Sequence, residues 1–230
     1  MTETGREQAR LVAARLATAD APPALPIPVG PPGEIVHSPL ARAAETATAI
    51  GAALDNGGRG APVRPEPGLL EIGQGAWEGL HRDEIRERYG AELDAWRSRP
   101  AEVWAPGGES LAEVAARVRP ALARILDAQT ERPAGERADP VPGYRGARPA
   151  GPWSVLVAHD GVFKIVLLTL FDLPLERFWM WSFDLCGLSI VEVRDGRAVL
   201  RAHNLTDHLA PRLDAAALAE RQAREATGAL

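Results

Sequence analysis

The sequence is nearly free of cysteine, and it contains no long apolar run. Cys186 is the single cysteine of the 230 residues, which excludes an intramolecular disulfide framework. No stretch reaches the roughly 18 apolar residues that cross a bilayer, and the first residues lack the basic and then apolar pattern of a secretion signal. These absences predict a soluble, cytoplasmic protein with no membrane partner.

The sequence also lacks an excess of positive charge. Its net charge is −5, whereas a nucleic-acid surface usually needs a basic balance concentrated on one face. Lys164 is the only lysine among the 26 basic residues, so any other basic group in a site is an arginine that acts locally. With 46% hydrophobic residues the chain can bury one large core, and residues 1–230 are predicted to form a single domain.

Helical and strand patterns alternate in the first half. Residues 4–7, from Thr4 to Glu7, fit a capping box, and the apolar residues that follow at helical spacing are Ala9, Val12, Ala13 and Leu16. Residues 34–37 are predicted to form a strand. Ser38 and Pro39 then fit the N-cap and first position of a helix with inward residues Ala43, Ala47, Ile50 and Leu54. An extended piece is expected at residues 63–67 and a helix at residues 82–97.

The second half continues the alternation. Ser110 and Glu113 form a second capping box, and the helix that follows turns inward Leu111, Val114, Val118, Leu122 and Ile125. Residues 127–152 have no periodicity and are predicted to form a mobile surface loop. A buried strand at 153–158, an apolar helix at 162–171, a hairpin around Asp195-Gly196 and a polar helix at 214–226 complete the chain.

Strands that alternate with helices predict an α/β fold with a mostly parallel sheet covered on both faces. In such sheets ligands bind at the carboxyl ends of the strands. His37 and His159 both stand at the end of a predicted strand. The sequence therefore directs attention to the segments that follow these two histidines.

The first of these segments combines a hydroxyl with a guanidinium at a helix start. Ser38 precedes the predicted helix and Arg42 falls in its first turn. Free N–H groups, the helix dipole and an arginine fork all favour a bound phosphate. The alternative is an ordinary capped helix with a solvated arginine.

The second segment places an imidazole at a strand end. His159 closes an apolar strand, and Gly161 permits a tight turn into the next helix. A lone histidine is often structural, but one projected toward a helix N-terminus is well placed to meet a ligand.

Residues 69–80 supply two carboxylates, Glu71 and Glu78, around a glycine-rich turn that also holds Trp77. A carboxyl group kept protonated in a semi-apolar pocket can act as a general acid. Trp77 fits a core position as well as a pocket wall. The glycine spacing is one residue off the dinucleotide fingerprint and no strand–helix unit follows in register, so nucleotide binding is not predicted.

Taken together, these segments resemble the histidine phosphatases, also called the phosphoglycerate-mutase-like superfamily. The matching segments occur in the family's order at residues 2–9, 38–43, 71–79, 106–110 and 158–161. The resemblance implies a three-layer α/β/α sandwich. It also implies a phosphomonoester hydrolase that acts through a phosphohistidine intermediate, without metal or other cofactor, on a small phosphorylated metabolite, with a homodimer as one possible assembly.

The resemblance implies roles for individual residues. Arg42 and His159, with Ser38, bind the transferred phosphoryl group. Glu71 donates the proton to the leaving alkoxide and later activates water, and Glu78 is the competing choice for this acid.

Residues 106–110, Pro-Gly-Gly-Glu-Ser, resemble the phosphatase branch of the family more than the glycolytic mutases. Glu109 is expected to contact substrate hydroxyls at the pocket mouth, unless it and Ser110 only start the next helix. A phosphoglycerate mutase-type phosphotransferase is the alternative activity.

The sequence departs from the family pattern in two places. Asp160 stands where the family usually has glycine, and its charge is expected to narrow substrate choice. The family's nucleophile is a histidine in an Arg-His-Gly motif at the end of a central first strand, and the 230 residues contain no such motif. A chain without that strand is expected to fold poorly or to be inactive, because buried backbone groups would lose their partners.

Three hypotheses address the second departure. The first is that the gene start is misplaced, Met1 is an internal start codon, and the in-frame DNA upstream encodes the strand and the motif. The second is a non-catalytic descendant that binds phosphate through Arg42 and His159 without turnover. The third recruits His37 or His81 as a replacement nucleophile.

Overall fold

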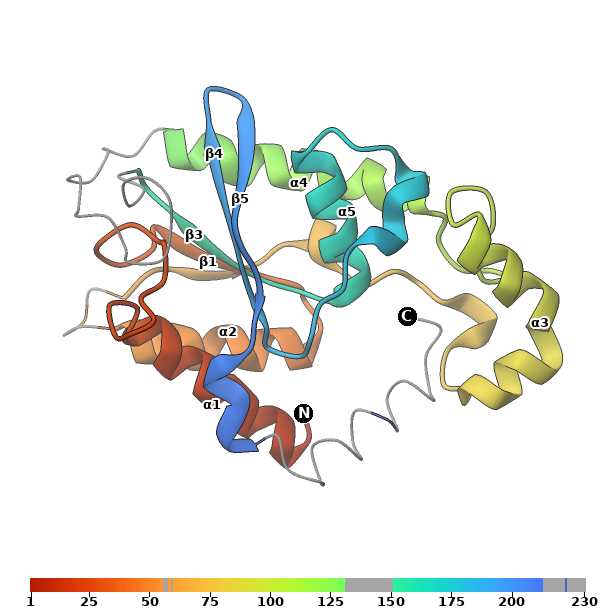
Figure 1. Cartoon of the computed structure of the whole chain (residues 1–230), viewed down its shortest axis with the longest axis horizontal. Coiled ribbons are helices and arrows are strands. Elements are labelled where there is room, and N and C mark those ends of the chain that lie inside the picture. Colours follow the sequence, from red (N-terminus) through yellow and green to blue (C-terminus); the bar gives the residue numbers. More distant parts are fainter. Residues whose placement is uncertain (56–57, 59, 131–150, 213–221, 223–230) are drawn as a thin grey trace.

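A computed structural model describes residues 1–55, 58, 60–130, 151–212 and 222 of the chain (Figure 1). Its helices are α1 (Glu3–Ala17), α2 (Ala41–Leu54), α3 (Arg82–Ser98), α4 (Leu111–Thr130) and α5 (Asp160–Leu170), and its strands are β1 (Glu34–His37), β2 (Val63–Pro65), β3 (Ser154–Val157), β4 (Leu188–Arg194) and β5 (Arg197–Leu205). Short 3-10 helices are η1 (Pro67–Leu69), η2 (Gly75–Trp77), η3 (Leu175–Met180) and η4 (Asp207–Arg212).

Three parallel strands form the central sheet in the order β2-β1-β3. The register pairs Ile35 with Val63 on one side and with Val155 on the other. β4 and β5 pair antiparallel as a separate two-stranded sheet. Asp195 and Gly196 connect them with φ of 50° and 71°, the left-handed backbone that a two-residue hairpin turn requires, so the predicted hairpin is confirmed.

Helices cover both faces of the parallel sheet. Successive residues of β1 point to opposite faces: Ile35 packs into the core against α1 and α2, and Val36 into the core against α4 and α5. Figure 1 shows the same arrangement, with α1 and α2 below the strands and α4 and α5 above them. The predicted α/β fold with three layers is confirmed.

The predicted inward faces of the helices are also confirmed. The predicted core positions are all buried in α1 (Ala9, Val12, Ala13, Leu16), in α2 (Ala43, Ala47, Ile50, Leu54) and in α4 (Leu111, Val114, Val118, Leu122, Ile125). Each large aliphatic side chain that is fully buried contributes about 1.5–3 kcal/mol of hydrophobic free energy.

A cluster of aromatic rings closes the core beside α3. Trp96 contacts Trp77 edge-on, with ring centroids 5.9 Å apart, and Trp179 at 4.7 Å. Trp77 and Phe178 are completely enclosed, with at most 1% of their surface exposed. Trp77 is therefore a core residue rather than a pocket wall.

Three local predictions need correction. The N-cap of α1 is Thr2 rather than Thr4, because the Thr2 hydroxyl accepts a 3.0 Å hydrogen bond from the Gly5 N–H and starts the helix earlier. The predicted loop at 127–152 begins later, since α4 continues to Thr130. The remainder at 131–150, and most of the helix predicted at 214–226, lie outside the described residues.

The third correction concerns the strand expected at 153–158. Every residue of β3, Ser154–Val157, is half-buried rather than buried. Within the described part of the chain, β3 pairs with β1 on one edge and is the last strand of its sheet, so its surface is less covered than that of a central strand.

No helix among the described residues is both long enough and apolar enough to cross a membrane.

Candidate active site

The carboxyl ends of β1 and β3 lie side by side and gather the polar side chains of the site. The register aligns His37 with Val157, and the Ser38 N–H donates to the Val157 carbonyl at 2.9 Å. α2 and α5 begin just beyond these ends, so the residues that follow each strand meet at two helix N-termini. This arrangement brings Ser38 and Arg42 next to His159.

The imidazole of His159 is buried between these two partners. Its Nε2 lies 2.9 Å from the Ser38 hydroxyl, and its Nδ1 accepts a hydrogen bond of 3.2 Å from Nε of Arg42. Because a guanidinium only donates, Nδ1 carries no proton, and the neutral ring holds its proton on Nε2, which donates to Ser38. Three of the predicted phosphate-binding residues therefore form one hydrogen-bonded group.

Ser38 does not have the capping role predicted for it. The N-cap of α2 is Leu40, which makes no side-chain capping bond, and the helix starts at Ala41. Ser38 is fully buried, and its hydroxyl meets His159 and accepts a weak 3.4 Å bond from the Leu40 N–H. Burial of a hydroxyl favours a partner from inside the core, and here that partner comes from the neighbouring strand end.

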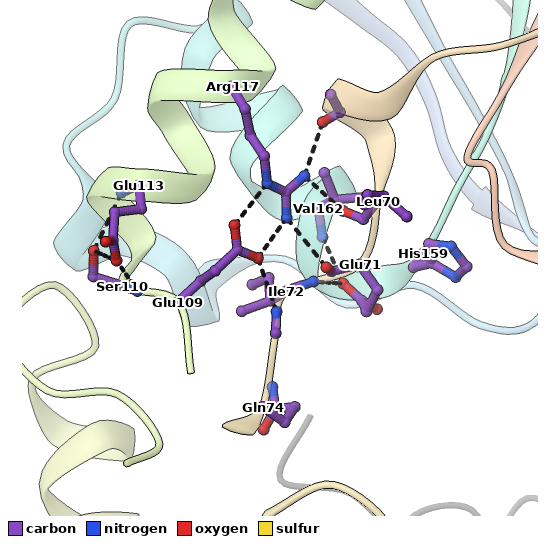
Figure 2. A network of polar contacts seen from close by, with 12 residues as sticks. Leu70, Glu71, Ile72, Gln74, Glu109, Ser110, Glu113, Arg117, His159 and Val162 are labelled. Atoms are coloured by element: carbon purple, nitrogen blue, oxygen red, sulfur yellow. Dashed lines mark hydrogen bonds and ion pairs between the residues drawn. The ribbon is translucent and has the colours of Figure 1, made fainter. Parts of the chain in front are cut away.

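The carboxyl group of Glu71 rests on the first turn of α5. Its Oε1 accepts hydrogen bonds from the Ile72 N–H at 2.9 Å and from the Val162 N–H at 3.2 Å (Figure 2). Burial raises the pKa of Glu71 above its ordinary value, the charge of Asp160 acts in the same direction, and the backbone N–H bonds partly oppose both. A carboxyl group with a raised pKa keeps its proton closer to neutral pH, as a general acid must.

The other candidate acid lies elsewhere. Glu78 is exposed, and its Oε1 accepts a bond from the Gln74 N–H across the glycine-rich turn. This contact ties Glu78 to the local turn, whereas Glu71 reaches the helix that starts next to His159. The structure thus distinguishes two carboxylates that the sequence left as alternatives.

Arg117 of α4 holds the segment that carries Glu71. Its guanidinium donates to the carbonyl oxygens of Gly68 at 3.0 Å, Leu70 at 2.7 Å and Glu71 at 3.1 Å. It also donates to both carboxylate oxygens of Glu109, at 2.9 and 2.8 Å (Figure 2). These five bonds match the five N–H groups of the guanidinium, so Arg117 fixes the backbone beneath Glu71.

Glu109, predicted to contact substrate, has two partners within the protein. Arg117 binds both of its oxygens, and Oε2 also accepts from the Gly73 N–H at 2.9 Å. The hydrogen bonds from Arg117 hold the pKa of Glu109 below its ordinary value. These contacts join the start of α4 to the Glu71 segment, and a direct contact with substrate stays a prediction.

Ser110 starts α4 as expected. Its hydroxyl and N–H both bind Oε2 of Glu113, at 2.7 and 2.8 Å, and the Glu113 N–H returns a bond to the hydroxyl. This reciprocal arrangement is a capping box. It confirms the second capping prediction and fixes the helix from which Arg117 projects.

Arg117 was not among the residues predicted from the sequence. One signal was present, since Arg117 lies seven residues after Ser110, a spacing that returns to the same face of a helix. That spacing alone does not separate it from the many other arginines, because three of its five bonds go to backbone carbonyls, which no residue type reveals.

The two histidines considered as replacement nucleophiles have other surroundings. His37 is buried, with 9% of its surface exposed, and its Nδ1 lies 2.8 Å from the Ser38 carbonyl oxygen. His81 is exposed and precedes α3, where its N–H donates to Glu84 at 2.8 Å. Neither has a hydrogen bond to His159 or Arg42 among those found in the described residues.

The part of the chain that the structure describes gathers no group of three or more His, Cys, Asp or Glu side chains suited to a metal ion. Chemistry without a metal stays a prediction from the sequence.

The chain is similar to known proteins in sequence and in fold. Residues 1–206 match the sequence model of the histidine phosphatase superfamily, branch 1. Phosphoserine phosphatase 1 of Hydrogenobacter thermophilus is 26% identical over 209 residues, which cover 91% of this chain and 82% of that protein. Glucosyl-3-phosphoglycerate phosphatase of Mycobacterium tuberculosis is 36% identical over 146 residues, 63% of this chain and 56% of that protein.

A solved structure shares the fold. The complex of mycobacterial glucosyl-3-phosphoglycerate phosphatase with inorganic phosphate superimposes with a TM-score of 0.69 at 28% identity, covering 90% of this chain and 88% of that one.

Proposed function

The chain belongs to the histidine phosphatase superfamily, branch 1, and we propose that its activity is the hydrolysis of phosphomonoesters. The proposed reaction needs no metal and forms a phosphohistidine intermediate. The expected substrate is a small phosphorylated metabolite, and the expected compartment is the cytoplasm. The two curated relatives compared above are named as phosphatases, which supports hydrolysis over phosphoryl transfer to a second sugar hydroxyl.

One observation carries the proposal. A carboxyl group with a raised pKa, Glu71, lies on the first turn of α5, and His159 directly precedes that helix and binds Arg42 and Ser38. This arrangement supplies a proton donor next to a cationic group at two helix N-termini. Cleavage of a phosphate monoester needs both, because charge develops on the phosphoryl oxygens and on the leaving oxygen.

The binding step uses the cluster around His159. A phosphoryl group at the N-termini of α2 and α5 would accept hydrogen bonds from the Arg42 guanidinium, and from His159 when that ring takes up a proton at Nδ1, the nitrogen that faces Arg42. Arg42 is exposed while His159 is buried, so the anion would enter from the Arg42 side and replace the direct contact between the two.

The chemical steps use Glu71. As a histidine nitrogen forms a bond to phosphorus, the bond from phosphorus to the leaving oxygen breaks, and protonated Glu71 supplies the proton that this oxygen needs. In the second step the Glu71 carboxylate takes a proton from water, whose oxygen attacks phosphorus and displaces the histidine. Glu71 then ends the cycle protonated, as it began.

The proposal assigns no nucleophile within the 230 residues, because the sequence holds no Arg-His-Gly motif. It follows that this chain by itself should bind phosphate and should turn over phosphomonoesters poorly or not at all. Phosphate binding without turnover is thus the second candidate function.

A phosphate-release screen tests the proposal. The 230-residue chain, and a longer form if the reading frame continues upstream, are assayed against a panel of small phosphomonoesters. Turnover that is lost in Glu71→Gln and His159→Ala, and retained in Glu78→Gln, supports the proposed hydrolase.

Inorganic phosphate is titrated into the same proteins by calorimetry. Binding without release supports the second candidate. Absence of both binding and release in every form contradicts the proposed function.

A further inference from the structure

Two carboxylates share the first turn of α5. Asp160 is the first residue of this helix, and Glu71 is bonded to the N–H of Val162 two positions later. The packing is close, since a Cβ placed on Gly161 would lie 2.7 Å from Oε1 of Glu71. A glycine at 161 therefore lets Glu71 approach the helix, and Asp160 adds a second negative group at the same end.

The carboxylate of Asp160 is fixed in position. Its Oδ2 lies 2.7 Å from Nζ of Lys164, one helical turn later, and its Oδ1 accepts a 3.2 Å bond from the Phe183 N–H. Each oxygen thus has its own donor. The side chain cannot rotate away from Glu71 without breaking one of these bonds.

Lys164 is confined as well. Only 4% of its surface is exposed, and its ammonium group lies 5.1 Å from the ring centre of Phe178 and 4.7 Å from that of Trp179. Contact with aromatic faces stabilises a desolvated cation. The pair between Lys164 and Asp160 is therefore held inside the protein, where solvent screens charges weakly.

The other charged groups near Glu71 have other partners. Arg117 of α4 binds the Glu71 carbonyl oxygen and is itself neutralised by Glu109. Arg42 of α2 donates to His159, which precedes α5. Asp160 is the group whose charge raises the pKa of Glu71 in addition to burial.

We propose that Asp160 is a positioning residue that keeps the proton on Glu71 until substrate takes it, and that Lys164 limits this effect so that Glu71 can still ionise. Both halves matter for a two-step reaction, because Glu71 must be an acid in the first step and a base in the second. This inference rests on the role of Glu71 in the proposed function.

Direct titration of Glu71 tests the proposal without requiring turnover. Protein labelled with carbon-13 in its glutamate side chains is titrated by NMR, and Glu71→Gln identifies the Glu71 carboxyl signal. Asp160→Asn retains an oxygen that can accept from the Phe183 N–H, removes the charge, and gives up the oxygen that accepts from Lys164. Its titration midpoint should fall by about one pH unit, the usual scale of a nearby like charge.

Removing the cation should have the opposite effect. Lys164→Met keeps an unbranched side chain against the aromatic rings, leaves Asp160 unneutralised, and should move the Glu71 midpoint upward. If this variant does not fold, Asp160→Asn combined with Lys164→Met restores charge balance, and its Glu71 midpoint should fall below that of the wild type by less than in Asp160→Asn, which leaves Lys164 uncompensated. The matched control is Asp94→Asn, since Asp94 pairs with Arg86 on the surface of α3 and should leave the midpoint unchanged.

A midpoint that does not fall in Asp160→Asn, alone or in the double variant, overturns the proposal. A second measurement separates it from the proposed function. Where a form releases phosphate, kcat declines at alkaline pH, and the midpoint of that decline should move to lower pH in Asp160→Asn by the same number of pH units as the NMR midpoint. Absence of release from every form, a longer one included, together with a lowered midpoint contradicts the hydrolase but leaves the effect of Asp160 on Glu71 intact. Release with an unmoved midpoint supports the hydrolase and contradicts the role of Asp160.

Discussion

Arg42 and His159 stand 117 positions apart in the sequence, yet Nε of Arg42 donates a 3.2 Å hydrogen bond to Nδ1 of His159. The contact exists because β1 and β3 are neighbours in the sheet and because each strand leads almost directly into a helix. An anion that enters here finds a guanidinium and an imidazole already brought together, and it binds by replacing the hydrogen bond between them.

Arg42→Ala should weaken the binding of inorganic phosphate. A hydrogen bond to a charged group contributes about 1.5–3 kcal/mol, which corresponds to roughly a 10- to 150-fold rise in Kd. Calorimetric titration measures the change. Arg86→Ala is the control, since Arg86 pairs with Asp94 on the exposed face of α3. Equal losses in both variants would mean that only overall charge matters.

Glu71→Gln should lower kcat of an active form by roughly 10²- to 10⁴-fold, the usual contribution of a general acid or base. Glutamine can still accept the N–H bonds of Ile72 and Val162, so the local fold should persist. Steady-state phosphate release measures kcat, and Glu78→Gln should leave it unchanged. A larger effect at Glu78 would assign the acid to the glycine-rich turn instead.

The same substitution should stabilise the protein at neutral pH. Because the pKa of Glu71 is raised in the folded state, the folded chain binds more protons than the unfolded chain between the ordinary and the raised value. The contribution of Glu71 to the free energy of unfolding therefore declines as pH rises through that window. Glu71→Gln removes this decline. Its free energy of unfolding should therefore exceed that of the wild type at pH values above the raised pKa, and should match it at pH values below the ordinary pKa.

Urea denaturation at several values between about pH 4 and pH 8 measures this difference. A gap between the two proteins that is constant with pH would show that packing, rather than ionisation, separates them.

Arg117→Lys should lower kcat more than it raises KM. Lysine offers three donors where Arg117 uses five, so the backbone carbonyls from Gly68 to Glu71 would lose part of their support. A misplaced acid costs on the order of 100-fold in rate, while Arg42 and His159 still bind phosphate. Kinetics of an active form separate kcat from KM.

Arg124→Lys is the matched control for Arg117→Lys. Arg124 lies on the same helix and bonds to Glu66 at 2.9 Å, and its substitution should change neither constant appreciably. A rise in KM alone for Arg117→Lys would place Arg117 in phosphate binding.

The helices and strands could be predicted because their signals are local. The inward residues of α1, α2 and α4 recur with helical periodicity, and these residues are the ones that each helix buries in the core. The alternation of strands and helices likewise indicated the parallel sheet. The half-buried state of β3 was not predictable, since it depends on which strands pair with it.

The site was predictable in its residues and less so in its contacts. Ser38 matched an N-cap pattern locally, but its hydroxyl is hydrogen-bonded to His159, which follows another strand. Glu71 was the predicted acid and Glu78 its competitor, and the hydrogen bond from the Val162 N–H, 91 positions away from Glu71, is a contact that Glu71 alone of the two makes. The roles of these residues depend on hydrogen bonds between distant parts of the sequence, and residue spacing does not predict such bonds.

The aromatic enclosure of Lys164 has a practical consequence. A protease that cleaves only after lysine has one target in this chain, and that target is 4% exposed in the middle of α5. Cleavage requires that α5 separate from the sheet, by local opening or by unfolding of the whole domain, so the rate of cutting reports how often Lys164 becomes exposed. The rate at which two fragments of known size appear would then measure how often the helix beside the phosphate site opens.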